Sequence, residues 1–141
     1  MKDGELYEIA LNYFAMCKET NSIYYFGEDV DFYENGVITS HDGSWLHGVR
    51  GARAGLQMPG LPLLGSRYFQ EIAEGVALDR AEILRLDATV TTPFARFSNV
   101  LLTEETSPLT PGVKEEKFYA PDIGLIKDGP VVLVKAGFSI R

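Results

Sequence analysis

The stretch from Ile23 to Ser40 constrains the fold more than any other part of the sequence. Residues 23–33 alternate between two sets of side chains, as the period of a β-strand requires. The set expected to face the core is apolar except for Glu28 and comprises Tyr24, Phe26, Glu28, Val30 and Phe32. Glu34-Asn35-Gly36 then predicts a tight hairpin turn, because Asn-Gly readily adopts positive φ angles. Residues 37–40 are expected to return as the partner strand.

Glu28 interrupts the apolar set. An uncompensated polar group among aromatic side chains costs roughly 2–7 kcal/mol, and a charge costs more, unless it is paired, hydrogen-bonded or protonated. Glu28 is therefore either a ligand-binding or metal-binding group in a cavity or a carboxylate with a structural partner. A third alternative is a β-bulge at Gly27 that turns Glu28 outward, since glycine inside a strand often marks a bulge. The structural alternatives are favoured over a binding role.

Acidic residues cluster in the same stretch, which raises the question of a calcium site. Glu28, Asp29, Asp31 and Glu34 supply oxygen ligands, but their order does not match an EF-hand loop. Asp29 and Asp31 lie two residues apart, as solvated charges on an exposed strand face do. We therefore expect neither a metal site nor a cofactor.

Length and composition predict one globular domain spanning residues 1–141. A hydrophobic content of 45% and a charged content of 23% are ordinary for such a domain. The net charge of −7 argues against nucleic acid and anionic lipid as partners, since both require a basic surface. Cys17 is alone, which excludes an internal disulfide, and no apolar run is long enough to span a bilayer.

The first residues suggest that the sequence begins within a longer one. Lys2-Asp3-Gly4 has the form of a hairpin turn, and a turn needs a strand before it. We expect an upstream strand or a leader that precedes this sequence, and Met1 as the genuine start of the chain is the alternative. A periplasmic or envelope location would follow from such a leader.

Strand patterns continue along most of the chain, and helix periodicity appears nowhere over a useful length. The further expected strands are residues 5–18, 67–73, 76–92, 97–104, 113–119, 123–127 and 131–135. Short turns join most of them, which predicts an all-β, antiparallel meander that forms a curved sheet, open barrel or half-barrel. The exception is residues 41–65, which are rich in Gly and Pro and are expected to form a long loop with at most a short helical turn.

Two ionisable residues, Arg80 and Glu82, interrupt an otherwise aliphatic strand face. A mutual or cross-strand ion pair is the favoured explanation, and a polar-lined cavity would produce the same pattern. The long loop contains glycines, but it matches neither the spacing of a dinucleotide-binding turn nor that of a P-loop.

Several segments together resemble a family of bacterial proteins to which no activity is assigned. They are residues 24–36 (YYFGEDVDFYENG), His41, Gly43 and Trp45, and residues 55–60, 78–83 and 106–126. The resemblance implies an exported or lipid-anchored protein. The segment YAPDIGLI, residues 119–126, is also similar to bacterial envelope proteins with a curved antiparallel sheet, such as the lipoprotein-carrier folds. Where the family has a glycine-containing turn after Thr-Pro, this chain has Pro93-Phe94-Ala95-Arg96, which puts the geometry of that turn in doubt.

Three classes of function are compatible with these features. The leading hypothesis is a non-enzymatic binding module, whose long loop covers one mouth of the sheet and encloses a small apolar or lipid-like ligand. Its candidate ligand-binding residues are Tyr24, Phe26, Glu28, His41, Trp45, His47, Met58, Arg80 and Glu82. The alternatives are an assembly protein acting through protein–protein contacts and a metal-dependent or histidine-assisted hydrolase, although no nucleophile motif is present. The oligomeric state stays open.

Overall fold

The computed structural model describes residues 4–137, and the described chain consists of β-strands joined by turns, with no helix. The strands form two sheets, each with antiparallel pairing, and neither strand order closes on itself. The all-β, antiparallel prediction is therefore confirmed. The chain forms two compact units. Unit 1 comprises the chain up to Leu61 together with residues 68–80 and 107–109, and unit 2 comprises residues 62–67, 81–106 and those from Thr110 onward.

The single-domain expectation stays a prediction, because two compact units can belong to one domain. The predicted turn at Lys2-Asp3-Gly4 lies mostly outside the described residues. Within residues 4–137 there is no helix long and apolar enough to cross a membrane.

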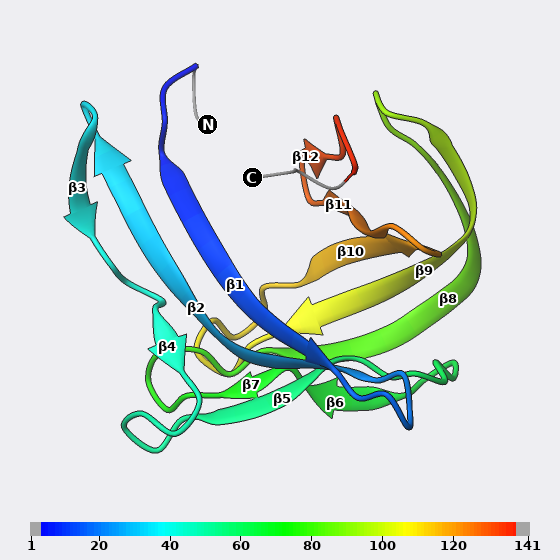
Figure 1. Ribbon diagram of the computed structural model, residues 1–141, viewed down its shortest axis with the longest axis horizontal. Coiled ribbons are helices and arrows are strands. Elements are labelled where there is room, and N and C mark those ends of the chain that lie inside the picture. Colours follow the sequence, from blue (N-terminus) through cyan, green and yellow to red (C-terminus); the bar gives the residue numbers. More distant parts are fainter. Residues whose placement is uncertain (1–3, 138–141) are drawn as a thin grey trace. The chain divides into compact units, whose positions relative to one another are not determined.

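The sheet of unit 1 is organised around one long strand, β2 (Ile23–Glu34) (Figure 1). Strand β1 (Glu8–Met16) pairs along one side of β2. Along the other side of β2 lie, in chain order, β3 (Val37–Ser40), β4 (Trp45–Leu46) and β5 (Arg53–Met58). Strand β5 in turn pairs with β7 (Glu71–Ile72). β2 thus pairs directly with four other strands of the sheet.

The predicted hairpin at Asn35-Gly36 is present, and a second hairpin joins β1 to β2. The turn between β1 and β2 places Asn21 at a φ of 55°, and the Cys17 N–H donates to the Ser22 carbonyl. Asn35 and Gly36 connect β2 to β3 with φ angles of 52° and 77°, as a two-residue hairpin turn of this composition requires. The Asn-Gly signal therefore located this turn correctly.

A β-bulge in β2 changes which side chains face the core. Tyr13 lies opposite Gly27 and Phe14 lies opposite Tyr25, so that Phe26 has no residue opposite it. Gly27 has a φ of 148°, and a Cβ there would collide with the backbone of β4. Only glycine fits this position without displacing the neighbouring strand.

The bulge makes the expected core face of β2 wrong in its first half. Tyr25 is buried with 8% of its surface exposed, whereas Tyr24 is 38% exposed. Beyond the bulge the phase agrees with the prediction, and Val30 is buried. The extra residue shifts the alternation by one, and a shift by one exchanges the two faces of a strand.

The prediction of a long loop over residues 41–65 is also wrong, because β4 and β5 lie within it. Its glycines serve two different purposes. Gly43, Gly48 and Gly51 have positive φ angles in turns, as the prediction supposed. Gly55 lies inside β5, where a Cβ would collide with the backbone of Phe69 and Gln70. In the sequence, Gly55 was therefore mistaken for a loop residue, although it is required because a neighbouring backbone segment lies close to β5.

The second sheet carries unit 2 and has the strand order β12-β11-β10-β9-β8-β6. Its strands are β6 (Arg67–Phe69), β8 (Arg80–Thr91), β9 (Arg96–Thr106), β10 (Glu115–Ala120), β11 (Gly124–Asp128) and β12 (Val131–Val132). The long strands β8 and β9 bend together in Figure 1. Val100, Ile126 and Ala88 form the centre of the unit's core, with Phe97 and Phe118 packed against it.

Most strand predictions in this part of the sequence are confirmed, with two corrections. The strand expected over residues 67–73 is divided between β6 and β7, which belong to different sheets. The strand expected from Val76 begins at Arg80, because residues 74–76 form a turn and Ala73 bridges to Ala77. The turn after β8 is closed by Thr92, whose Oγ1 accepts the N–H groups of Phe94 and Ala95.

Candidate functional site

Unit 1 contains an aromatic and polar cluster centred on the buried side chain of Tyr25. The Tyr25 hydroxyl donates to Asn12 Oδ1 on β1 at 2.6 Å. Its ring stacks on Phe14 with centroids 4.9 Å apart, and Trp45 meets it edge-on at 5.2 Å. Residues from β1, β2 and β4 therefore converge on one side chain that the sequence had not singled out.

Carboxylates surround this cluster and govern the chemistry of Tyr25. Burial raises the pKa of Tyr25, and the charges of Glu28, Glu71 and Asp79 raise that pKa further. Glu71 is only 2% exposed, and its Oε1 accepts the Asp79 N–H at 2.6 Å. Tyr25 is thus held as a neutral hydrogen-bond donor, which excludes it as a general base at neutral pH.

Trp45 is the one residue of this cluster with an unmet hydrogen bond. Its side chain is buried, and its Nε1 has no acceptor within residues 4–137. A buried indole N–H normally finds a partner.

The two histidines lie on different parts of unit 1 and have separate partners. The exposed His41 places Nδ1 at 2.7 Å from Asp31 Oδ1, within hydrogen-bond distance. His47 accepts the Ala54 N–H at Nδ1, 3.0 Å away, and meets the ring of Phe26 edge-on at 5.6 Å. They do not form a joint catalytic or metal-binding pair.

The other candidate residues do not converge either. Glu28 lies opposite both Asn12 and Trp45, so the structure brings Glu28 and Trp45 together. Tyr24 and Met58 lie towards the other end of β2, next to the pairing with β5. In the described part of the chain, no group of three or more His, Cys, Asp or Glu side chains is arranged to hold a metal ion.

Arg80 and Glu82 have different partners. The Arg80 guanidinium lies 6.0 Å from the centroid of the Phe69 ring. Glu82 forms an ion pair with Arg67, whose Nε is 2.9 Å from Glu82 Oε2. A cross-strand ion pair was one of the predicted alternatives, and Glu82 forms such a pair with Arg67 rather than with Arg80.

Unit 2 has a buried polar cluster of another kind. Lys117 Nζ lies 2.8 Å from Glu105 Oε2 and 3.6 Å from Asp128 Oδ2, and the Tyr119 hydroxyl donates to Glu105 Oε1. Burial lowers the pKa of Lys117, but the charge of Glu105, the hydrogen bond to it, and the charges of Asp128 and Glu115 leave this pKa raised. The cluster places one cation between two carboxylates and joins β9, β10 and β11, as a structural ion-pair network does.

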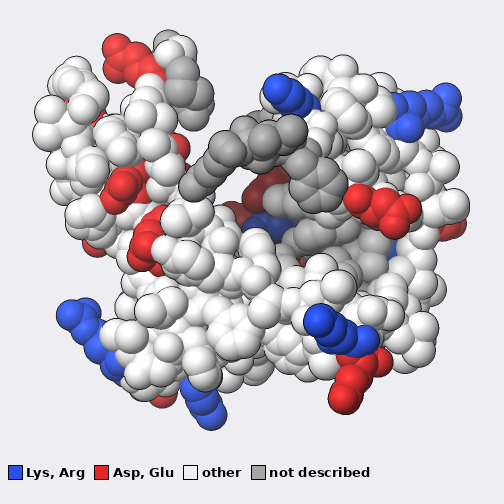
Figure 2. Space-filling view, viewed as in Figure 1, with Lys and Arg blue, Asp and Glu red and all other residues white. Residues whose placement is uncertain are grey.

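The most unusual surface of the described chain is strand β1. All nine of its residues are exposed, including Leu11 at 56%, Phe14 at 52% and Met16 at 62%. Within the described range β1 pairs with β2 alone, so its other edge has no strand beside it. Figure 2 shows mainly uncharged side chains over the lower half of β1. The sequence carried a signal for this surface, because Ala10, Phe14 and Met16 make the second face of the strand apolar as well.

Comparisons of the chain with protein-family models, with curated proteins and with solved structures find no significant match. The resemblance to an exported bacterial family stays a prediction.

Proposed function

We propose that this protein is a non-enzymatic interaction module in which the free edge of β1 adds a strand to the β-structure of a protein partner. The observation that carries the proposal is the long, exposed edge of β1, which pairs with no strand of residues 4–137 other than β2 on its opposite side. Strand addition to such an edge is a recurrent form of protein recognition, because the free backbone groups supply the hydrogen bonds.

The composition of β1 supports this proposal. Proteins that keep an edge strand unpaired usually protect it with charged residues, proline or a bulge. From Ile9 to Met16 the strand has no charged residue and no proline. The bulge beside it lies in β2, where Phe26 is the extra residue, so β1 itself stays regular.

A site-specific crosslink tests the proposal. A photo-reactive amino acid at Ala10, on the free edge, is expected to give a protein adduct in cells that express the chain. The matched control is the same amino acid at Thr89, an exposed position in β8. Adducts from Ala10 that disappear with Met16→Asp support an edge contact. Equal adducts from both positions, or none from Ala10, contradict it.

A small-molecule binding role is the second candidate, and the unmet N–H of Trp45 favours it. A ligand with a hydrogen-bond acceptor at this position would satisfy the indole. Native mass spectrometry of protein purified from cells, followed by gentle denaturation, tests this role. A bound mass that leaves on unfolding and is lost in Trp45→Phe supports it, and a bare chain mass contradicts it.

The hydrolase alternative receives no support from the described residues. His41 and His47 have separate structural partners.

A further inference from the structure

We infer that the partner of the β1 edge is a second copy of this chain, paired antiparallel to β1 about a two-fold axis at Tyr13. The inference rests on the proposed function of the edge and adds the identity of the partner and the register of pairing.

The hydrogen bonds of β1 determine which residues are available for such pairing. The Tyr7 carbonyl accepts the Tyr33 N–H, and at the other end the Cys17 N–H donates to the Ser22 carbonyl. In an antiparallel pair, alternate residues direct both backbone groups to the same neighbour. The odd-numbered residues of β1 therefore bond to β2, and the even-numbered residues direct their N–H and C=O groups outward. The outward residues are Glu8, Ala10, Asn12, Phe14 and Met16.

A two-fold pairing must place outward residues opposite outward residues, so only a few registers are possible. With Tyr13 on the axis, Ala10 lies opposite the partner's Met16 and Asn12 lies opposite the partner's Phe14. Each of these pairs exchanges two backbone hydrogen bonds. The strand is regular over this range, because the bulge belongs to β2, and no distortion of β1 interrupts the ladder.

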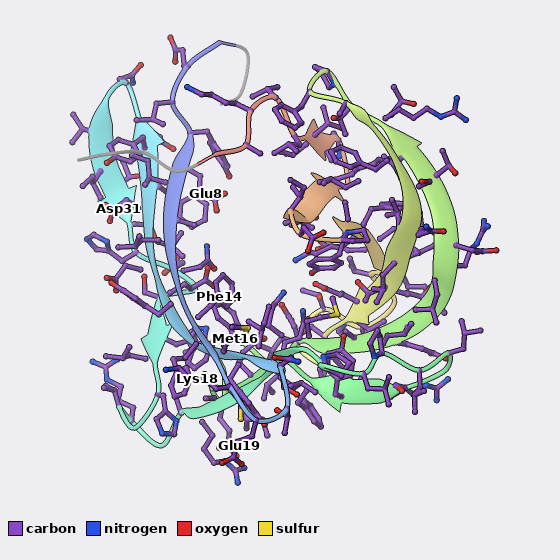
Figure 3. The ribbon with its side chains drawn as sticks, turned by 45° about the vertical axis from the view of Figure 1, so that its right-hand side comes forward. Glu8, Phe14, Met16, Lys18, Glu19 and Asp31 are labelled. Carbon is purple, nitrogen blue, oxygen red and sulfur yellow. The ribbon has the colours of Figure 1, made fainter. Side chains whose placement is uncertain are left out.

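Charge selects this register among the possible ones. Glu8 and Lys18 are the charged residues that flank the apolar stretch, and Figure 3 shows them near the two ends of β1 with Phe14 and Met16 between them. With Tyr13 on the axis, the ladder runs from Ala10 to Met16, and Glu8 at each end lies beside the partner's turn, which begins at Lys18. A shift to Asn12 on the axis places Glu8 opposite the partner's Met16, and a shift to Phe14 moves Glu8 past Lys18 and beyond the end of the partner's strand.

The side chains of the opposite face agree with the same register. Leu11 lies opposite the partner's Ala15, which pairs a large side chain with a small one. The two Tyr13 rings become neighbours across the axis, and aromatic cross-strand pairs stabilise antiparallel sheets. Cys17 lies opposite the partner's Ile9, so the two copies of Cys17 are far apart.

Sedimentation and native mass spectrometry of the full chain over a range of concentrations test the self-association. We expect a monomer–dimer equilibrium that Lys18→Glu weakens about tenfold, because both end pairs become repulsive. The double exchange of Glu8→Lys with Lys18→Glu should restore the wild-type dissociation constant. Glu19→Gln, beside Lys18 but outside the pairing, is the matched control and should leave the constant unchanged.

Single cysteines in a Cys17→Ser background test the register. Directly opposite residues at the axis of a non-hydrogen-bonded pair have Cα atoms about 4.5 Å apart, within the range for a disulfide. Tyr13→Cys should therefore crosslink two chains under mild oxidation. Leu11→Cys and Ala15→Cys should not, since four residues of strand separate each from its copy by about 13 Å.

The outcomes separate this inference from the function on which it rests. A dimer that crosslinks at position 13 alone and responds to the charge exchange supports the inference. A monomer at all concentrations, a dimer that crosslinks at another position, or a dimer indifferent to Lys18→Glu overturns it. Adducts from Ala10 to a different protein would preserve the edge function while excluding self-pairing.

Discussion

Strands β1 and β9 have similarly apolar centres, yet the structure treats them in opposite ways. Residues 100–103 of β9 are all buried, whereas no residue of β1 is. β9 has a neighbour on each side, β8 and β10, while β1 has only β2 among the residues that the structure describes. Apolar content alone therefore does not make a strand part of the core. The number of neighbouring strands and the cover over each face decide it.

The two strands are also held by different chemistry. β9 is joined to β10 by the buried ion pair of Glu105 and Lys117. β1 is joined to β2 by the stacking of Phe14 on Tyr25 and the hydrogen bond from Tyr25 to Asn12. Removing one partner of a buried charged pair lowers the free energy of unfolding by more than removing one partner of a neutral hydrogen bond at an edge.

The largest expected effect comes from breaking the ion pair of β9. Lys117→Met should lower the free energy of unfolding by about 3–5 kcal/mol, because it leaves the Glu105 carboxylate buried without a cation. Lys114→Met is the control. It removes an exposed pair with Glu104 and should cost about 0–1 kcal/mol. Urea denaturation measures both, and equal losses would show that Glu105 is hydrated in the native state.

Leucine truncation tests the difference in burial directly. Leu102→Ala in β9 should cost about 2–5 kcal/mol, since it opens a cavity in a buried site. Leu11→Ala in β1 should change stability by less than about 0.5 kcal/mol in the monomer. Denaturation at low protein concentration is the measurement. A loss above 2 kcal/mol for Leu11→Ala would mean that another part of the chain or a partner covers β1.

Removal of the Tyr25 hydroxyl has a smaller expected effect. Tyr25→Phe deletes one hydrogen bond to Asn12 and should cost about 0.5–1.5 kcal/mol. Tyr24→Phe, at the neighbouring exposed position, should be close to neutral. If the two variants have the same stability, the hydroxyl of Tyr25 contributes nothing to the attachment of β1.

The smallest effect is one of pH and concerns Lys117. The pKa of Lys117 is raised in the folded state above its unfolded value of about 10.4. The stabilisation from this shift is therefore fully present below about pH 10.4 and is lost as the pH rises through the folded-state pKa. The stability difference between wild type and Lys117→Met should stay constant from pH 7 to 10 and narrow above that. A difference that already narrows between pH 7 and 9 would contradict the raised pKa.

The sequence predicted the all-β class, the hairpin at Asn35-Gly36 and most strands of unit 2, because alternation and Asn-Gly or Asp-Gly turns are local signals. It failed at Gly55, where the reason for glycine is the backbone of a strand distant in sequence. It also missed Tyr25, since the bulge at Phe26 and Gly27 shifts the alternation in a way that periodicity cannot locate. Glu28 and Trp45 lie opposite each other across β2 and β4, a pairing for which the sequence carried no local signal.

The local pairing of β1, β2 and β3 has a consequence for the order of folding. These strands are joined by short turns, so their pairing needs only residues up to Ser40. Contacts between residues close in sequence form fastest, and N-terminal segments leave the ribosome first. The meander can therefore be complete, with its β1 edge exposed, while most of the chain is still being synthesised. Chains made side by side on one messenger RNA would then meet edge to edge before their C-terminal strands exist.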